Sequence, residues 1–393
     1  MFVMLFRAIK KLLWGISLFF LPAGCINNED PAPAPPDTLY RTVLVYLGVD
    51  NNFGHEARMK IDTLWRHWRG DYYGNLLVYA DAGKESVLVR IYQDSSGVNL
   101  KDTVRVYSVE DSADPAVLKR VLNEVKASWP AQGYGLVVLS HATGWLPDGT
   151  MARPRSIIDD QGKQMELRDF AAALPYKLEF ILFDACLMGS VEVMYELKDK
   201  ADFIVASPTE VIASTDQSKA PGFIYTGMMK HLMAPVADLK GVAKEFYDFY
   251  NNHPDGGSWR SATVTVTETA KLDTLASLSK SLLQGVDGAS LVNLAEIQTY
   301  GYGNNYLYTD FGDYIRAVQP QRYDEFTNLL NQCFVYKAHT PGYYSAGNDS
   351  RDPVTPITHY SGLSIYVPQQ AYTFMNGEYR KLKWVQRVLP YIP

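Results

Sequence analysis

Short apolar runs alternate with amphipathic segments along most of the chain. The near-continuous apolar runs that predict buried strands are residues 41–50, 75–82, 135–142, 180–186 and 201–208. Segments with apolar residues at helical spacing lie between most of them, at residues 54–68, 114–129, 165–174 and 190–200. Strands buried on both faces and separated by helices predict a mostly parallel sheet covered by helices on each side.

Two further patterns complete the expected elements. Residues 86–93 and 103–109 predict a hairpin pair, and Asp114 is placed to cap the helix that follows it. Beyond residue 229 the pattern is less regular, although residues 238–252 predict a helix and residues 261–269 a strand. We therefore expect a first region over 41–228 and a C-terminal α+β region over 229–393 that packs on it.

Reactive side chains gather where the predicted strands end. Asp50, His141 and the pair Asp184 and Cys186 stand at such ends, and residues 207–210 follow the last of these strands. The carboxyl ends of parallel strands meet at one edge of a sheet, where α/β proteins commonly bind their ligands. The sequence therefore predicts a functional site at this edge.

The first residues have the anatomy of a secretion leader. Basic residues precede an apolar run over 12–20 that is too short to span a bilayer as a helix. The run closes on "LPAGC", which resembles a bacterial lipoprotein processing site, although Pro22 stands where an aliphatic residue is usual. This predicts a signal peptide over 1–25 with Cys25 as the acylated first mature residue; an ordinary cleaved signal is the alternative.

Residues 26–40 are polar and rich in proline, which predicts an extended tether between a membrane and a folded body. We therefore expect a cell-envelope location, lipid-anchored at the outer membrane or cell surface, or else secretion. The chain has 37 basic and 43 acidic residues without a basic block, so nucleic acid is not an expected partner.

Only three cysteines are present, which leaves Cys186 and Cys333 if Cys25 carries lipid. Cys333 lies at helical spacing with Phe326 and Leu330 and is expected to be buried. Two interpretations of Cys186 compete with a catalytic one: a small core residue, or one end of a disulfide to Cys333. No Cys-x-x-Cys or His-Glu-x-x-His spacing supports a zinc site.

The segments "SHATGW" at 140–145 and "FDACLMG" at 183–189 resemble the two catalytic motifs of the clostripain-like cysteine peptidases, relatives of caspases, gingipains and legumains. Shorter matches are "VDNNF", "IVASPTE" and "GLSIYVP", at residues 49–53, 204–210 and 362–368. The resemblance implies a caspase-like α/β/α sandwich. It also implies endopeptidase activity after Arg or Lys.

Carried over position by position, the resemblance makes Cys186 the nucleophile and His141 the general acid/base. Asp184, two residues before the cysteine, would help to form the pocket for a basic P1 side chain, with Glu210 as a second candidate. A carboxylate suits this task because it pairs with a guanidinium through two hydrogen bonds. An internal ion pair between Asp184 and an arginine is the alternative.

The loop after the histidine departs from the family at Ala142, where glycine is common. Its backbone N–H can still serve an oxyanion hole, but a positive φ there would cost roughly 1–3 kcal/mol. Gly144 and Trp145 are expected to shape the loop and the wall beside His141.

Many relatives bind calcium and cut themselves between the histidine and the cysteine. The basic segment 151–164 lies there, and Arg155 is the candidate site for self-processing; a solvated loop is the alternative. The sequence itself requires no cofactor, and calcium is a candidate only through the resemblance, without EF-hand spacing.

A catalytically impaired or inactive surface binding protein on the same scaffold is the alternative function. The tether and the tyrosine-rich segment 300–314 favour it, because clustered tyrosines often line recognition surfaces.

Overall fold

The computed structural model of the chain describes residues 39–48, 54–81, 85–108, 110–148, 157–160, 162–212, 221–286, 292–301, 306–345 and 354–389. Cys25, Asp50 and Arg155 lie outside these ranges, as do the predicted signal peptide and most of the tether. The chain divides into Met1–Asp37 and Thr38–Pro393, and every element below belongs to the second unit. Within the described ranges, no helix combines the length and the hydropathy that crossing a membrane requires.

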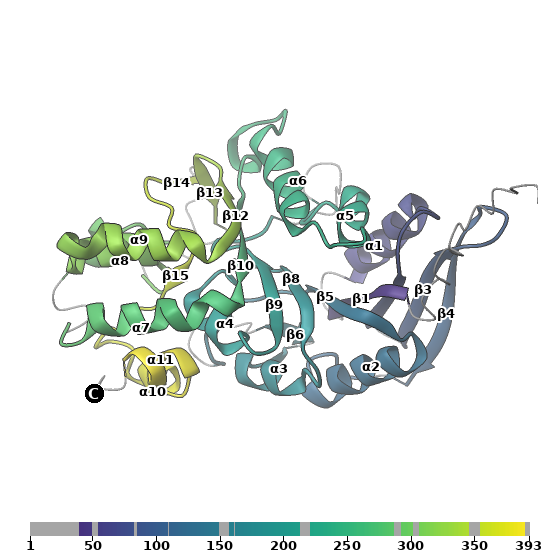
Figure 1. Cartoon of the computed structure of the whole chain (residues 1–393), viewed down its shortest axis with the longest axis horizontal. Coiled ribbons are helices and arrows are strands. Elements are labelled where there is room, and N and C mark those ends of the chain that lie inside the picture. The colour runs from purple at the N-terminus through teal and green to yellow at the C-terminus, as the bar shows by residue number, and fades with distance from the viewer. Residues whose placement is uncertain are drawn as a thin grey trace, which may run out of the picture. The chain divides into compact units, whose positions relative to one another are not determined.

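A nine-stranded sheet organises the fold, in the order β12-β10-β9-β8-β5-β1-β2-β3-β4 (Figure 1). Its parallel centre consists of β1 (Leu39–Gly48), β2 (Asn75–Asp81), β5 (Ala131–Leu139), β8 (Leu178–Asp184) and β9 (Ala201–Ala206). The antiparallel edges are β3 (Ser86–Gln93) with β4 (Asn99–Tyr107), and β10 (Thr263–Glu268) with β12 (Phe334–His339). The predicted mostly parallel sheet is confirmed, as is the hairpin at one edge.

Helices cover both faces of this sheet (Figure 1). One face carries α1 (Gly54–His67), α5 (Tyr225–Leu232) and α6 (Leu239–Asn251); the other carries α2 (Pro115–Ser128), α3 (Leu167–Ala173) and α4 (Val191–Glu196). Each face of the sheet has its own apolar core, and successive side chains of a strand point to opposite faces. In β8, Phe180 and Leu182 face the α1 side, whereas Ile181 and Phe183 face the α4 side. This arrangement confirms the expected α/β/α sandwich.

The later half of the chain continues the same sheet, because β10 and β12 extend it. After α5 and α6, the described helices of this half are α7 (Leu272–Leu283), α8 (Phe311–Val318), α9 (Tyr323–Gln332), α10 (Thr373–Tyr379) and α11 (Lys383–Val388). Its short strands pair as β11 (Thr309–Asp310) with β15 (Ser364–Ile365), and β13 (Gly342–Tyr344) with β14 (Val354–Pro356). Earlier in the chain, β6 (Ile158–Asp160) pairs with β7 (Lys163–Met165). The boundary expected at residue 229 falls inside α5.

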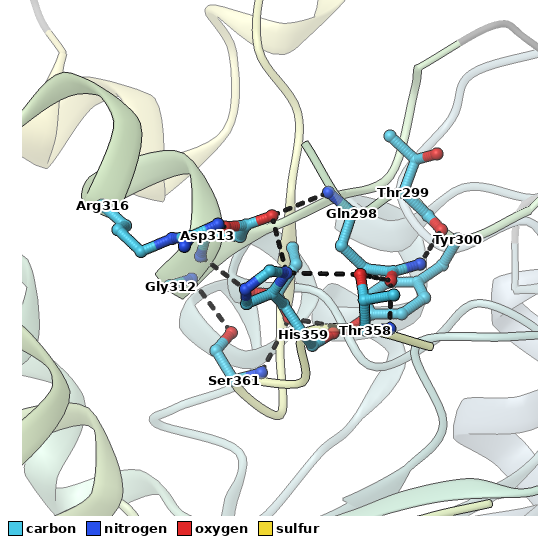
Figure 2. A network of polar contacts seen from close by, with 10 residues as sticks. Gln298, Thr299, Tyr300, Gly312, Asp313, Arg316, Thr358, His359 and Ser361 are labelled. Carbon is cyan, nitrogen blue, oxygen red and sulfur yellow. Dashed lines mark hydrogen bonds and ion pairs between the residues drawn. The ribbon is translucent and has the colours of Figure 1, made fainter. Parts of the chain in front are cut away.

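A polar network ties the C-terminal segments together, and Figure 2 shows it around Asp313. This buried carboxylate accepts hydrogen bonds from the Gln298 backbone N–H at 2.8 Å and from Arg316 Nε at 2.9 Å, and lies 3.6 Å from His359 Nδ1. Gln298 Oε1 in turn accepts from the Thr358 N–H at 2.8 Å. The network joins α8 to the two segments beside it, one of which leads into β15.

Candidate active site

The structure brings His141 and Cys186 to the same edge of the sheet. β5 and β8 are parallel neighbours, and their register pairs Leu139 with Asp184. His141 and Cys186 each follow two residues later, so both leave the sheet at the same level. Both side chains are half-buried. The two residues therefore leave the carboxyl ends of neighbouring strands level with each other, and the contact of the thiol with the imidazole stays a prediction.

A tight turn presents Cys186 between β8 and α4. Leu187 adopts the left-handed conformation, with φ of +61°, which is strained for a residue with a branched side chain. The Leu187 N–H donates to the Thr209 carbonyl at 3.0 Å, and the Gly189 N–H donates to the Ser207 carbonyl at 2.8 Å. The segment after β9 thus holds the turn in its strained conformation.

The histidine loop touches this turn through its backbone. Gly144 has φ of +66°, and a Cβ built there would lie 2.7 Å from the Leu187 carbonyl oxygen. Among the described residues, only Leu187 and Tyr306 combine a side chain with positive φ, so the strain considered for Ala142 does not arise. Gly144 instead takes the left-handed position, for which glycine alone is suited.

The sulfur of Cys186 contacts the segment after β9. The Val211 N–H donates to Sγ at 3.4 Å, and the thiol lies 3.8 Å from the Val211 carbonyl oxygen. A hydrogen bond donated to sulfur favours the thiolate, which is the nucleophilic form. Cys186 and Cys333 are both free thiols, so the disulfide interpretation is wrong. Burial raises the pKa of Cys333 to about 12, which keeps that thiol protonated and inert.

Asp184 has an internal partner, although not the arginine considered above. Lys60 Nζ on α1 lies 2.8 Å from Asp184 Oδ2, and the Phe223 N–H donates to Oδ1 at 3.0 Å. Gly222 packs so closely, with φ of +67°, that a Cβ there would lie 2.5 Å from Oδ1. Asp184 is only 2% exposed, because Lys60 and the segment around Gly222 enclose its carboxylate.

Glu210 is also buried and lies next to Val211, the residue that contacts the Cys186 sulfur. Its Oε1 accepts a hydrogen bond from the Ser345 hydroxyl at 2.6 Å. Ser345 follows β13, whereas the partners of Asp184 come from α1 and the segment before α5. The two candidate pocket carboxylates are thus held by different parts of the fold.

A model of the clostripain family matches residues 45–384. The chain belongs to the clostripain family of cysteine proteases. Clostripain of Hathewaya histolytica is 24% identical over an alignment of 228 positions, which covers 49% of this chain and 42% of that protein. The chain thus matches less than half the length of this curated relative.

Solved structures of the same family agree in fold. An inactive zymogen C11 protease from Parabacteroides distasonis is 31% identical with a TM-score of 0.79, covering 90% of this chain and 99% of that chain. A secreted C11 cysteine protease from Bacteroides thetaiotaomicron, solved with an irreversible peptide inhibitor, is 26% identical with a TM-score of 0.77, covering 89% and 99%. The expected family and fold class are confirmed.

Trp145 of this clostripain-family chain is buried at the end of the histidine loop. Its ring packs against Tyr366 and Tyr379, with centroid distances of 5.1 and 4.9 Å. Behind them, Glu192 Oε1 accepts hydrogen bonds from the Tyr366 N–H at 2.8 Å and from the Tyr379 hydroxyl at 3.0 Å. Burial raises the pKa of Glu192 from 4.5 to about 7.

Glu192 makes the stability of the fold depend on pH. Because its native pKa lies above the unfolded value, folding takes up a proton between these values, and stability falls as pH rises through them. We expect this group to cost about 3 kcal/mol of unfolding free energy between pH 4.5 and pH 8. Glu192→Gln should remove that share of the loss, measured by denaturant unfolding at both pH values. Glu296→Gln, at an exposed position, is the control. If the unfolding free energy of Glu192→Gln falls with pH as steeply as that of the wild type, Glu192 is not the group responsible.

The sequence analysis did not identify Lys60 as a partner of Asp184, because its position in α1 is not distinguished by the apolar pattern. The large apolar residues of α1 include Met59, Ile61, Leu64 and Trp65, but the buried positions are Glu56, Ala57, Lys60 and Leu64. Glu56 and Lys60 stand four residues apart on the same stripe as Leu64. A charged pair at that spacing in line with a buried leucine was the available signal.

The tyrosine-rich segment 300–314 of this clostripain-family chain contributes several side chains to the core. Tyr300, Tyr308 and Tyr314 are buried, so these three side chains do not contribute to a recognition surface, whereas Tyr306 is half-buried. Tyr308 instead donates from its hydroxyl to the Thr143 carbonyl at 2.7 Å, beside the histidine loop. In the described part of the chain, no group of three or more His, Cys, Asp or Glu side chains is placed to hold a metal ion.

Proposed function

We propose that this protein is an endopeptidase that uses Cys186 and His141 as a catalytic dyad. The Cys186 thiolate attacks the scissile carbonyl carbon and forms an acyl-enzyme, while His141 protonates the departing amine. His141 then takes a proton from the water that hydrolyses the acyl-enzyme. Backbone N–H groups near Cys186 and between Ala142 and Gly144 stabilise the oxyanion. The observation that carries the proposal is the β5–β8 register, which sets the two residues level at one edge.

The substrate class is a protein or peptide with Arg, or less readily Lys, at P1. Asp184 and Glu210 are the carboxylates that supply the pocket, and both are buried near the turn that carries Cys186. A carboxylate of low exposure discriminates strongly for a cation, because the surroundings screen the attraction poorly. Arginine is favoured over lysine because its planar fork can use two acceptor atoms at once.

Covalent labelling with an irreversible peptide inhibitor carrying P1 Arg tests this function. Tandem mass spectrometry should locate the adduct on Cys186, and a fluorogenic library should show turnover highest at P1 Arg. Cys333→Ala, which removes the buried thiol, is the matched control and should be labelled normally. Labelling that is absent or falls elsewhere, with and without added calcium or a chelator, would contradict the dyad. Comparing the calcium and chelator arms also tests the calcium dependence that the family suggests.

The location and maturation of the protein are part of the same proposal. Acylation at Cys25 would anchor the folded unit to the cell envelope through the residue 26–40 tether, and release of an unacylated chain is the alternative. Cleavage after Arg155 would mature the enzyme. Intact masses of the protein used for labelling, isolated from its native membrane, report both events: the lipid on Cys25, and two fragments that separate at Arg155.

A further inference from the structure

Three charged side chains are buried together behind the proposed P1 pocket. Lys60 Nζ lies 2.8 Å from Asp184 Oδ2 and 3.6 Å from Glu56 Oε1, and the three side chains are no more than 5% exposed. The ammonium also donates to the Pro221 carbonyl and lies 4.0 Å from the centre of the Tyr225 ring. We call Glu56, Lys60 and Asp184 the charge cluster.

The composition of the charge cluster matters because little solvent reaches it. An ammonium buried at this depth is kept only where carboxylates and carbonyls compensate for its lost hydration. Two carboxylates and one ammonium leave the cluster with one formal negative charge in excess. Such a group can accept one further cation without acquiring net positive charge, and a basic P1 side chain supplies that cation.

A cavity beside the cluster gives Lys60 room to move. Its volume is about 240 Å³, and its lining includes Lys60, Thr63, Pro221, Tyr225 and Phe249. A lysine side chain has four rotatable bonds and three donors, so it can exchange one acceptor for another at modest cost. This space gives the Lys60 ammonium room to withdraw from Asp184 Oδ2.

We infer that Lys60 is a displaceable counter-ion of the P1 pocket, and that Glu56 retains it when a substrate cation takes Asp184. This inference rests on the proposed function and adds to it a pair of specificity-determining residues on α1. In the free enzyme Lys60 neutralises Asp184; in the complex the P1 guanidinium replaces it. The free energy needed to move Lys60 lowers the affinity for basic substrates. The negative charge of Glu56 raises that affinity.

A series of charge variants tests the inference. The readout is the ratio of kcat/KM for a P1 Arg peptide to that for the same peptide with citrulline, a neutral isostere of arginine. Glu56→Gln should lower the ratio roughly tenfold and Lys60→Met should raise it roughly tenfold, because each changes the charge beside a poorly screened cation by one unit. The double variant E56Q/K60M keeps the formal charge but vacates Asp184, and its ratio should equal or exceed that of the wild type.

Lys244→Met is the matched control, since Lys244 pairs with Asp248 at the same four-residue spacing on α6 but is exposed. Its ratio should not change. If Lys60→Met alone fails to fold, the ratios of the wild type, Glu56→Gln and the double variant still have a predicted order that can be checked. Ratios that stay constant across the folded variants would overturn the inference.

A binding measurement separates this inference from the proposed function. Calorimetry of Cys186→Ala chains carrying the same substitutions compares arginine amide with citrulline amide and needs no turnover. If the binding ratios follow the charge series while no variant cleaves peptides, the proposed function fails and the inference stands. If cleavage of P1 Arg peptides is normal and neither ratio follows the series, the inference fails alone.

Discussion

Replacing Cys186 with alanine is expected to lower kcat for a P1 Arg peptide by about 10⁴-fold or more, and His141→Ala should cost nearly as much. Without the sulfur no acyl-enzyme can form, and the leaving amine has no covalent intermediate from which to depart. Without the imidazole, the thiol has no base and the amine no acid at neutral pH. Both substitutions should lower kcat and leave KM nearly unchanged, because neither side chain is proposed to hold the P1 residue.

Steady-state kinetics of the two single variants and the double variant measure this effect. Because the two groups act in one step, the double variant should be no slower than the slower single variant. Cys333→Ala controls for the loss of a thiol as such. A kcat of Cys186→Ala within tenfold of the wild-type value would refute the dyad. If both single variants are slow and their effects multiply in the double variant, the two groups act independently.

The sheet and its reactive edge could be predicted because their signals are local. Apolar runs at 135–142 and 180–186 identified two buried strands, and the rule that parallel strands end at one edge placed His141 and Cys186 together. The register of Leu139 with Asp184 sets His141 and Cys186 level where their strands end. Asp114 likewise caps α2, accepting from the Ala116 N–H at 2.8 Å.

The partners of these groups could not be predicted, because they depend on which distant segments meet. Asp184 was expected to face a substrate cation or an arginine, and it pairs with Lys60, more than a hundred residues earlier. The tyrosines of 300–314 were expected at the surface from their composition, yet Tyr308 is buried against the histidine loop. A side chain with an apolar body and a polar tip fits either setting, and tertiary packing decides between them.

Gly144→Ala is expected to lower kcat by about 10²-fold, because a displacement of about 1 Å in a catalytic group has an effect of that size. The new Cβ would lie 2.7 Å from the Leu187 carbonyl oxygen, closer than side-chain carbons approach backbone atoms. Neither partner can relax easily: Gly144 lies in the loop that carries His141, and the Leu187 N–H is bonded to Thr209 in the turn that carries Cys186. The loop must therefore move away from the turn, and the imidazole moves with it.

Gly97→Ala separates this contact from the strain of the backbone alone. Gly97 has φ of +84° and no atom within 4 Å of a built Cβ, so alanine there should cost only the left-handed strain of about 1–2 kcal/mol in unfolding free energy. Gly144→Ala should lose more stability than Gly97→Ala, and only Gly144→Ala should lose activity. Equal losses of stability with full activity in both would mean that the two loops adjust freely, and that the contact between Gly144 and Leu187 does not position the histidine.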